Sequence, residues 1–317
     1  MSNFDIPILL IIFNRLDTTI QVVDSIRTIQ PSKLYIASDG PRKNREGEDE
    51  IVKAVRDYVL KSVDWNCEVK TLFHNENLGC GQGPAQAITW FFENEEMGII
   101  LEDDCIPSKS FFPYCEELLA KYKDDNRIYH IAGQNPLTLT KSPYSYYFAR
   151  IQHCWGWASW KRAWNNFSFE LNDLDDFIDN NIINKIFPHK NAQKFWLDLF
   201  KNIPNVKIDF WDYQWTYAIF KNNGLCINPT KNLVSNIGFN QNATHTLDSN
   251  SALSNQKRFE IYKIKHPPNI KVNNRILKEV NKISFGIQPK TLYSVIKEIT
   301  PTPLKNVIKK SLVVKDY

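Results

Sequence analysis

The segment Gly98-Ile99-Ile100-Leu101-Glu102-Asp103-Asp104-Cys105 joins a short apolar run to three consecutive carboxylates. Its apolar half has the continuous hydrophobic character of a strand buried on both faces of a parallel sheet. Three adjacent acids at the exit of such a strand repel one another unless a cation lies among them. Hard divalent cations such as Mg²⁺ and Mn²⁺ prefer carboxylate oxygens, so the segment indicates a metal site. The alternative is a solvated turn with helix-capping acids.

Three more apolar runs precede this segment and are separated by stretches with helical spacing of apolar residues. The expected strands are 7–13, 33–38, 68–73 and 98–101, and the expected helices are 16–29, 48–61 and 85–95, the last opened by a flexible glycine-rich loop at 79–84. Alternating strands and helices predict an α/β fold: a Rossmann-like, mainly parallel sheet with helices on both faces.

Each expected strand ends in a cluster of polar residues. The clusters are Asn14-Arg15, Asp39-Gly40-Pro41-Arg42, His74-Asn75 and Glu102-Asp103-Asp104. Open α/β sheets bind ligands at the carboxyl ends of their strands. Four polar tips on one edge therefore favour a ligand site over a solvated turn.

The second half of the chain is richer in helices and aromatic residues. We expect helices at 109–122, 171–200 (broken at Pro188) and 210–222, a strand at 127–132 and extended chain at 226–239. A basic, proline-punctuated tail follows from about residue 266. From residue 257 to the end, 14 Lys and Arg face 4 Asp and Glu, whereas the whole chain carries only +4.

Several classes of protein are disfavoured by what the sequence lacks. There is no apolar run of 18 residues and no signal-peptide pattern, so we expect a cytoplasmic protein. The six cysteines show no CxxC spacing, which predicts reduced thiols and no zinc site. Neither GxGxxG nor GxxxxGK[ST] occurs, which argues against dinucleotide oxidoreductases and P-loop enzymes.

Seven segments together resemble a known family. They are PILLIIFNR (7–15), SDGPR (38–42), NLGCGQG (77–83), LEDD (101–104), WGWASW (155–160), FWDYQW (210–215) and LVSNIGF (233–239). The set resembles nucleotide-diphospho-sugar glycosyltransferases of the GT-A fold, and more narrowly the bacterial relatives of the N-acetylglucosaminyltransferase I type. The resemblance covers about residues 5–245. It implies a GT-A domain at 1–250, with a nucleotide-binding half (1–105) and an acceptor-binding half (106–250), and a basic helical extension at 251–317.

The resemblance implies an inverting, metal-dependent transferase that uses Mn²⁺ (or Mg²⁺). The sugar would come from a nucleotide diphosphate, such as UDP-GlcNAc, and go to a hydroxyl of a surface-glycan or lipid-linked glycan. Two alternatives stay open. A sugar-nucleotide nucleotidyltransferase shares the sheet and acids, although its glycine-rich N-terminal loop with a following Arg and Lys is missing here. The other is a non-catalytic carbohydrate-binding protein of the same fold.

The same resemblance implies roles for the residues at the strand tips. Asp104 takes the place of the family's metal ligand. Glu102 and Asp103 would lie against the donor's sugar and ribose. Asp39 matches an aspartate that binds the nucleobase, and Arg15 an arginine beside the nucleotide.

The roles implied in the second half are less closely matched. Asp212 is the candidate catalytic base, but FWDYQW is one residue longer than the family's FWDDW-like segment; a capping acid is the alternative. His245 is a candidate contact to metal or pyrophosphate, and otherwise a structural histidine. Trp155 and Trp157 would form an acceptor wall or belong to the core.

The basic tail is a separate feature. Apolar residues at helical spacing between 292 and 312 alternate with lysines, a pattern typical of helices that lie on an anionic membrane. Peripheral contact with the inner face of the cell membrane would suit a lipid-linked acceptor. Packing on the body and dimerisation are the alternatives, and no motif indicates nucleic acid.

Overall fold

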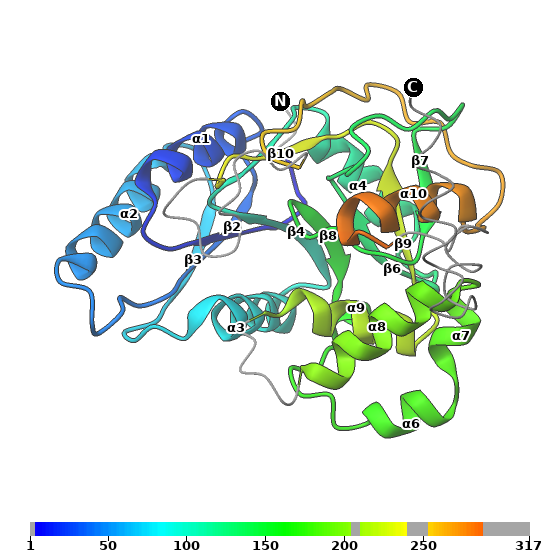
Figure 1. The fold of residues 1–317 in the computed structure, drawn as a ribbon. Helices are drawn as coiled ribbons and strands as arrows, with labels where there is room; N and C mark the ends of the chain where they lie inside the picture. The colour runs from blue at the N-terminus through cyan, green and yellow to red at the C-terminus, as the bar shows by residue number, and fades with distance from the viewer. Residues whose placement is uncertain (1–3, 204–209, 240–252, 288–317) are drawn as a thin grey trace, which may run out of the picture.

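A central sheet of eight strands runs through the described part of the protein, which comprises residues 4–203, 210–239 and 253–287 of a computed structural model (Figure 1). The strands are β1 (Ile8–Ile12), β2 (Lys33–Ser38), β3 (Glu68–Phe73), β4 (Met97–Glu102), β6 (Ile128–Ala132), β7 (Tyr146–Ala149), β8 (Trp157–Trp160) and β9 (Leu225–Pro229). Their order across the sheet is β3-β2-β1-β4-β8-β6-β9-β7.

The sheet is parallel over its first half and mixed over its second. β1 is parallel to β2 and β4, and β2 is parallel to β3. β8 is antiparallel to both β4 and β6, β9 is parallel to β6, and β7 is antiparallel to β9. The predicted α/β class with a mainly parallel sheet is therefore confirmed.

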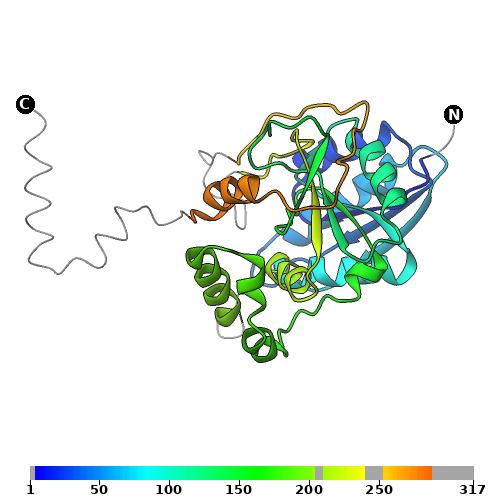
Figure 2. The ribbon, with the colours of Figure 1, turned by 90° about the vertical axis from the view of Figure 1, so that its right-hand side faces the viewer.

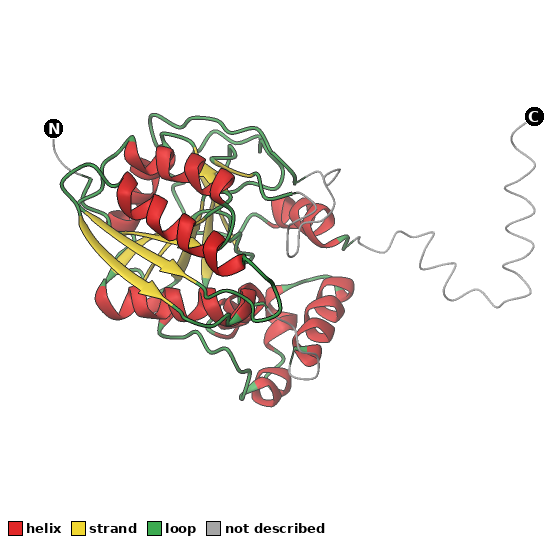
Figure 3. Cartoon of the chain, turned by 90° about the vertical axis from the view of Figure 1, so that its left-hand side faces the viewer, coloured by secondary structure: helices red, strands yellow, loops and turns green. Residues whose placement is uncertain are grey.

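Helices cover both faces of the sheet (Figure 3). One face packs on α1 (Leu16–Arg27), α2 (Glu48–Ser62) and α4 (Phe111–Lys121), and the other on α3 (Gly79–Asn94) and α5 (Lys161–Trp164). Successive side chains of a strand point to opposite faces of the sheet, which explains this division. In β1, Ile8 and Leu10 pack on the face covered by α1, α2 and α4, and Leu9 packs on the face covered by α3 and α5. Burial on both faces accounts for the unbroken apolar runs.

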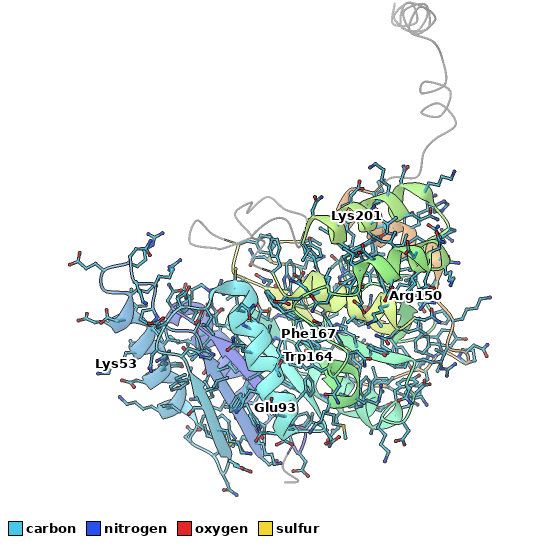
Figure 4. The ribbon with its side chains drawn as sticks, turned by 90° about the horizontal axis from the view of Figure 1, so that it is seen from below. Lys53, Glu93, Arg150, Trp164, Phe167 and Lys201 are labelled. Atoms are coloured by element: carbon cyan, nitrogen blue, oxygen red, sulfur yellow. The ribbon has the colours of Figure 1, made fainter. Side chains whose placement is uncertain are left out.

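A helical subdomain packs below the second half of the sheet. It contains α6 (Leu174–Asp179), α7 (Ile182–Ile186), α8 (Lys190–Asn202) and α9 (Asp212–Lys221). The chain expected to break only at Pro188 also breaks at Asn181, which has a left-handed φ of 51°. Aromatic rings fill the interface with α5: the ring of Trp164 lies 5.0 Å from that of Trp215 in α9 and stacks on Phe167 with centroids 4.2 Å apart (Figure 4).

The glycine-rich stretch predicted as a loop at 79–84 is instead the first part of α3, which begins at Gly79. The Asp39 carboxylate accepts the backbone N–H groups of Leu78 and Gly79, which begin this helix. An acid at a helix N-terminus satisfies unpaired N–H groups and interacts favourably with the helix dipole. Asp39 follows β2 and is distant in sequence from residues 79–84, so the composition of that stretch did not reveal the contact.

The described part of the basic extension packs on the body. Residues 253–273 cross the top of the molecule and lead into α10 (Asn274–Phe285) (Figure 2). The ring of Phe285 meets Phe195 and Trp196 of α8 with centroids 5.6 and 4.9 Å away. The amphipathic segment at 292–312 lies outside the described residues, and the domain boundary at 250 stays a prediction. Among the described helices, none has the length and apolarity that a bilayer span requires.

The approach of α3 to the sheet predicts a strong effect of Gly98→Ala in β4. An added Cβ would overlap the buried ring of Phe91 and lie 2.8 Å from the carbonyl oxygen of Pro7. Backbone and a fully buried ring cannot both move away, so we expect a loss of about 2 kcal/mol or more in the free energy of unfolding. Urea denaturation measures it, with Glu93→Ala on the exposed side of α3 as control. Equal midpoints for the two variants would contradict this packing.

Candidate functional site

The carboxyl ends of β1, β2 and β4 meet at one edge of the sheet. Their register pairs Ile12 with Ser38 and Ile11 with Glu102. A cavity of about 280 Å³ opens at this edge. Its polar lining comes mostly from the residues that follow the strands: Asn14, Arg15, Ser38, Asp39, Arg42, His74, Asn77, Glu102 and Asp103. The structure thus brings four of the predicted site residues, Arg15, Asp39, Glu102 and Asp103, to one cavity.

A larger hollow of about 710 Å³ lies elsewhere, beside the ribbon formed by β5 (Cys105–Pro107) and β10 (Val234–Asn236). The end of α1 and residues 255–258 contribute to its walls. None of the predicted site residues lines it. The smaller cavity holds four of the predicted residues, and the pKa values of Arg15, Glu102 and Asp103 in its wall are raised, so we take it as the candidate site.

Arg15 is the cation that lies among the acids at the end of β4. Its Nη1 donates to Asp104 Oδ2 at 2.9 Å, and its Nη2 forms an ion pair with Asp103. Burial lowers the pKa of Arg15, but the two carboxylates outweigh it and the net pKa is raised. Asp103 also accepts the backbone N–H of Phe13 at 3.2 Å. The guanidinium therefore offsets part of the repulsion among the acids.

Asp104 is held from the opposite side by the ribbon. Its Oδ1 accepts hydrogen bonds from Asn236 Nδ2 at 3.2 Å and from the Cys105 thiol at 3.3 Å. The backbone N–H of Ile237 donates to the Asp104 carbonyl at 2.9 Å. Both carboxylate oxygens of Asp104 thus have partners within the protein.

The donor set at this edge fits a hard divalent cation. Glu102, Asp104 and Cys105 each offer one atom, and these atoms lie within 4.8 Å of one another. Burial raises the pKa of Glu102, and the neighbouring charges of Asp104 and Asp103 raise it further, as expected where an additional cation is needed. Burial also raises the pKa of the Cys105 thiol, so the two carboxylates are the better ligands. His245 lies outside the described residues.

Asp39 has a structural role in addition to its place in the cavity wall. Its oxygens accept the backbone N–H groups of Gly40, Leu78 and Gly79 and the amide of Asn77, at 2.8 to 3.1 Å. A carboxylate has about four lone-pair positions, so these donors occupy its capacity. Its expected contact with a nucleobase stays a prediction.

Asp212 is the first residue of α9 and is partly buried. Burial raises its pKa to about 6, while its own N–H and that of Tyr213 oppose the shift. Its charge contributes to the raised pKa of both Glu102 and Cys154, which places it within electrostatic reach of the acids at the end of β4. A carboxylate from a different element thus lies within electrostatic reach of these acids, although it does not line the cavity.

The two predicted wall tryptophans lie in different environments. Trp157 is 0% exposed, and its ring stacks on His130 and Trp211 with centroids 4.9 and 5.7 Å away. It belongs to the core, one of the two interpretations left open by the sequence. Trp155 is partly buried and meets Phe239 edge to face at 5.5 Å. A contact between Trp155 and an acceptor stays a prediction.

Sequence reasoning assigned no role to Asn236 and Gly238, although both lie in the quoted LVSNIGF segment. The side-chain amide of Asn236 donates to the Asp104 carboxylate through Nδ2, and its Oδ1 accepts the backbone N–H of Gly238 at 2.8 Å. A Cβ on Gly238 would overlap Asp104 Oδ2 and lie 2.8 Å from Arg15 Nη1, so only glycine allows this approach. No signal within the segment shows the contacts with Asp104 and Arg15, because these two partners are more than 130 residues away.

Arg42 is a second cation at the cavity, and sequence reasoning assigned it no role. Its Nε donates to Glu48 at 3.0 and 3.1 Å, and Asn14 Nδ2 donates to the same carboxylate at 2.9 Å. Glu48 is buried, and this pairing lowers its pKa. Arg42 thus faces the cavity independently of the acids at the end of β4.

Comparison with known proteins gives no family assignment. No family model and no curated protein matches the chain. Among solved structures, a putative glucose-1-phosphate thymidylyltransferase from Bacillus anthracis is 10% identical over 80% of this chain and 98% of its own, with a TM-score of 0.37. HddC from Yersinia pseudotuberculosis is 12% identical over 54% and 86%, with a TM-score of 0.31. The glycosyltransferase GlyE from Streptococcus pneumoniae is 9% identical over 71% and 45%, with a TM-score of 0.32. Likeness at this level carries no conclusion about activity.

The raised pKa of Asp212 predicts that Asp212→Asn stabilises the protein in a pH-dependent way. The folded state holds this proton more tightly than the unfolded chain, where the pKa is near 3.8, so ionisation costs stability as the pH rises from about 4 to about 6. Asn cannot ionise. The free energy of unfolding of the variant should therefore rise relative to that of the wild type across this window, by roughly 2–3 kcal/mol at about 1.4 kcal/mol per pKa unit, and the variant should keep this gain at higher pH.

Thermal unfolding of both proteins between pH 4 and 8 measures this difference. Asp198→Asn, on the exposed side of α8, controls for loss of a surface charge. A gap between the curves that is constant with pH would show that Asp212 is not held in a desolvating environment.

Proposed function

We propose that the protein is an inverting, metal-dependent glycosyltransferase that moves a sugar from a nucleotide diphosphate, most simply a UDP-linked sugar such as UDP-GlcNAc, to a hydroxyl of a glycan or glycolipid acceptor. One observation carries the proposal. The acids at the end of β4 border a nucleotide-sized cavity, and an ionisable carboxylate from a separate helix, Asp212, lies within electrostatic reach of them. The two sets of carboxylates can therefore serve different chemical tasks.

The cavity supports a nucleoside diphosphate as the donor. Arg15 and Arg42 both line it, and guanidinium groups suit phosphate oxygens because they donate in a planar fork. Its floor near α3 carries Gly79, Gly83 and Ala87, small residues that allow a flat ring to approach the backbone. Glu102 and Asp103 line the same cavity at the end of β4, where the diphosphate and sugar would follow.

Glu102 and Asp104 would hold the metal in this proposal. A bound divalent cation would neutralise the charge that develops on the leaving diphosphate. Arg15 and Arg42 would orient the diphosphate from the cavity wall, and the buried ribbon contact from Asn236 would fix the carboxylate of Asp104.

Asp212 would be the general base. With a pKa of about 6 it is ionised at neutral pH and is still basic enough to accept a proton from an acceptor hydroxyl. The hydroxyl oxygen bonds to the anomeric carbon as the bond to the diphosphate oxygen breaks, and the proton passes to Asp212. Attack from the face opposite the leaving group inverts the anomeric centre. The absence of any covalent sugar intermediate follows from this single displacement.

A panel of UDP-, GDP-, CMP- and dTDP-sugars tests the proposal, with Mn²⁺ or EDTA and with water or simple glycosides as acceptor. We expect one donor to raise the melting temperature and to release nucleoside diphosphate only with metal. Asp104→Asn should lose metal-dependent donor binding. Asp212→Asn should keep donor binding and lose transfer by at least about 10²-fold. Asp198→Asn is the control for both.

Three results would overturn the proposal in different ways. Release of pyrophosphate from a nucleoside triphosphate and a sugar phosphate would identify a nucleotidyltransferase. Binding of sugars without turnover of any donor would identify a carbohydrate-binding protein. Sugar transfer at the normal rate by Asp212→Asn would uphold the glycosyltransferase reaction but show that Asp212 is not its general base.

A further inference from the structure

We infer that Arg15 occupies the metal-binding carboxylate Asp104 in the free protein and is drawn from it to the donor's diphosphate, so that metal and nucleotide bind cooperatively. The inference rests on the proposed metal and donor sites, but its test uses metal binding and needs no turnover.

The contacts of Asp104 show that a cation already holds the oxygen that a metal needs. Arg15 Nη1 lies 2.9 Å from Oδ2, while Oδ1 is shared by Asn236 and Cys105. A divalent ion bound at Oδ2 would lie a few ångströms from the guanidinium. Like charges at that distance in a partly buried site repel strongly, so metal and Arg15 compete for this oxygen.

Arg15 is the partner of Asp104 that can leave. Its side chain is 24% exposed and lines the donor cavity, whereas Asn236 is only 3% exposed and belongs to the β5–β10 ribbon. The backbone of Gly238 closes the other side of the ion pair, so the open path for the guanidinium leads into the cavity. That is where the diphosphate is proposed to bind.

The exchange explains cooperativity through charge alone. If a metal binds first, Arg15 stays beside the metal, because no diphosphate is present to attract its positive charge. If a nucleotide binds first and attracts Arg15, the acids Glu102, Asp103 and Asp104 lose their cation. When both bind, the metal replaces the guanidinium among the acids, and the diphosphate replaces the acids beside the guanidinium. Coupling of this kind is reciprocal: each ligand tightens the other by the same factor.

Arg42 provides a matched control within the same cavity. It also carries a guanidinium toward the donor site, but its partner is Glu48 and not the acids at the end of β4. Removing either arginine should weaken nucleotide binding. Only removal of Arg15 should change the affinity for a metal in the absence of nucleotide.

The experiment measures Mn²⁺ binding to the full chain by the electron paramagnetic resonance signal of free Mn²⁺, with and without UDP. We expect Arg15→Gln to bind Mn²⁺ alone at least about tenfold more tightly than the wild type, and Arg42→Gln to match the wild type. UDP should tighten Mn²⁺ binding to the wild type, and by a smaller factor in Arg15→Gln. Arg15→Lys keeps the positive charge, so its affinity for Mn²⁺ alone should stay close to that of the wild type.

Each measurement can overturn the inference. Equal Mn²⁺ affinity of Arg15→Gln and wild type would show that the guanidinium does not compete. An equal gain in Arg15→Lys would show that charge is not the cause. If Arg15→Gln does not fold, the wild type and Arg15→Lys still decide: UDP that leaves Mn²⁺ affinity of the wild type unchanged contradicts the exchange. If the wild type transfers no sugar but Arg15→Gln still binds Mn²⁺ more tightly, the proposed function is wrong and the competition between Arg15 and the metal for Asp104 is upheld.

Discussion

Repulsion among the three carboxylates at the end of β4 is the constraint on which the site depends. Glu102, Asp103 and Asp104 leave a strand that is buried on both faces, so water alone cannot screen them. Two side chains from different parts of the chain bind these acids. Arg15 enters from the end of β1, and Asn236 comes from the β5–β10 ribbon in the second half of the chain. The acids therefore connect the two halves of the chain.

The sequence was sufficient for those features that depend on short-range patterns. Continuous apolar runs predicted β1, β2 and β4, because strands covered on both faces have no polar side to show. Polar residues directly after these strands predicted the ligand edge, because parallel strands bring their carboxyl ends together without any knowledge of the loops. Arg15, Asp39, Glu102 and Asp103 reached one cavity for that reason.

What the sequence did not show depends on partners far away in the chain. The start of α3 at Gly79 is set by a carboxylate from the end of β2. Trp157 entered the core because His130 and Trp211 flank it, and neither is adjacent in sequence. Gly238 is required by an ion pair between Arg15 and Asp104. In each case a tertiary contact that the local sequence does not contain decides the structure.

The surroundings of the acids at the site differ from one another. Asp104 lies 2.9 Å from a guanidinium and accepts two further hydrogen bonds, one from Asn236 and one from the Cys105 thiol. Burial raises the pKa of Asp212 to about 6, although the N–H groups at the start of α9 favour its charged form. Carboxylates whose environments differ in this way suit different steps of one reaction. In the proposed reaction one acid would hold a metal and another would take up a proton, and the fold supplies these two acids from opposite halves of the chain.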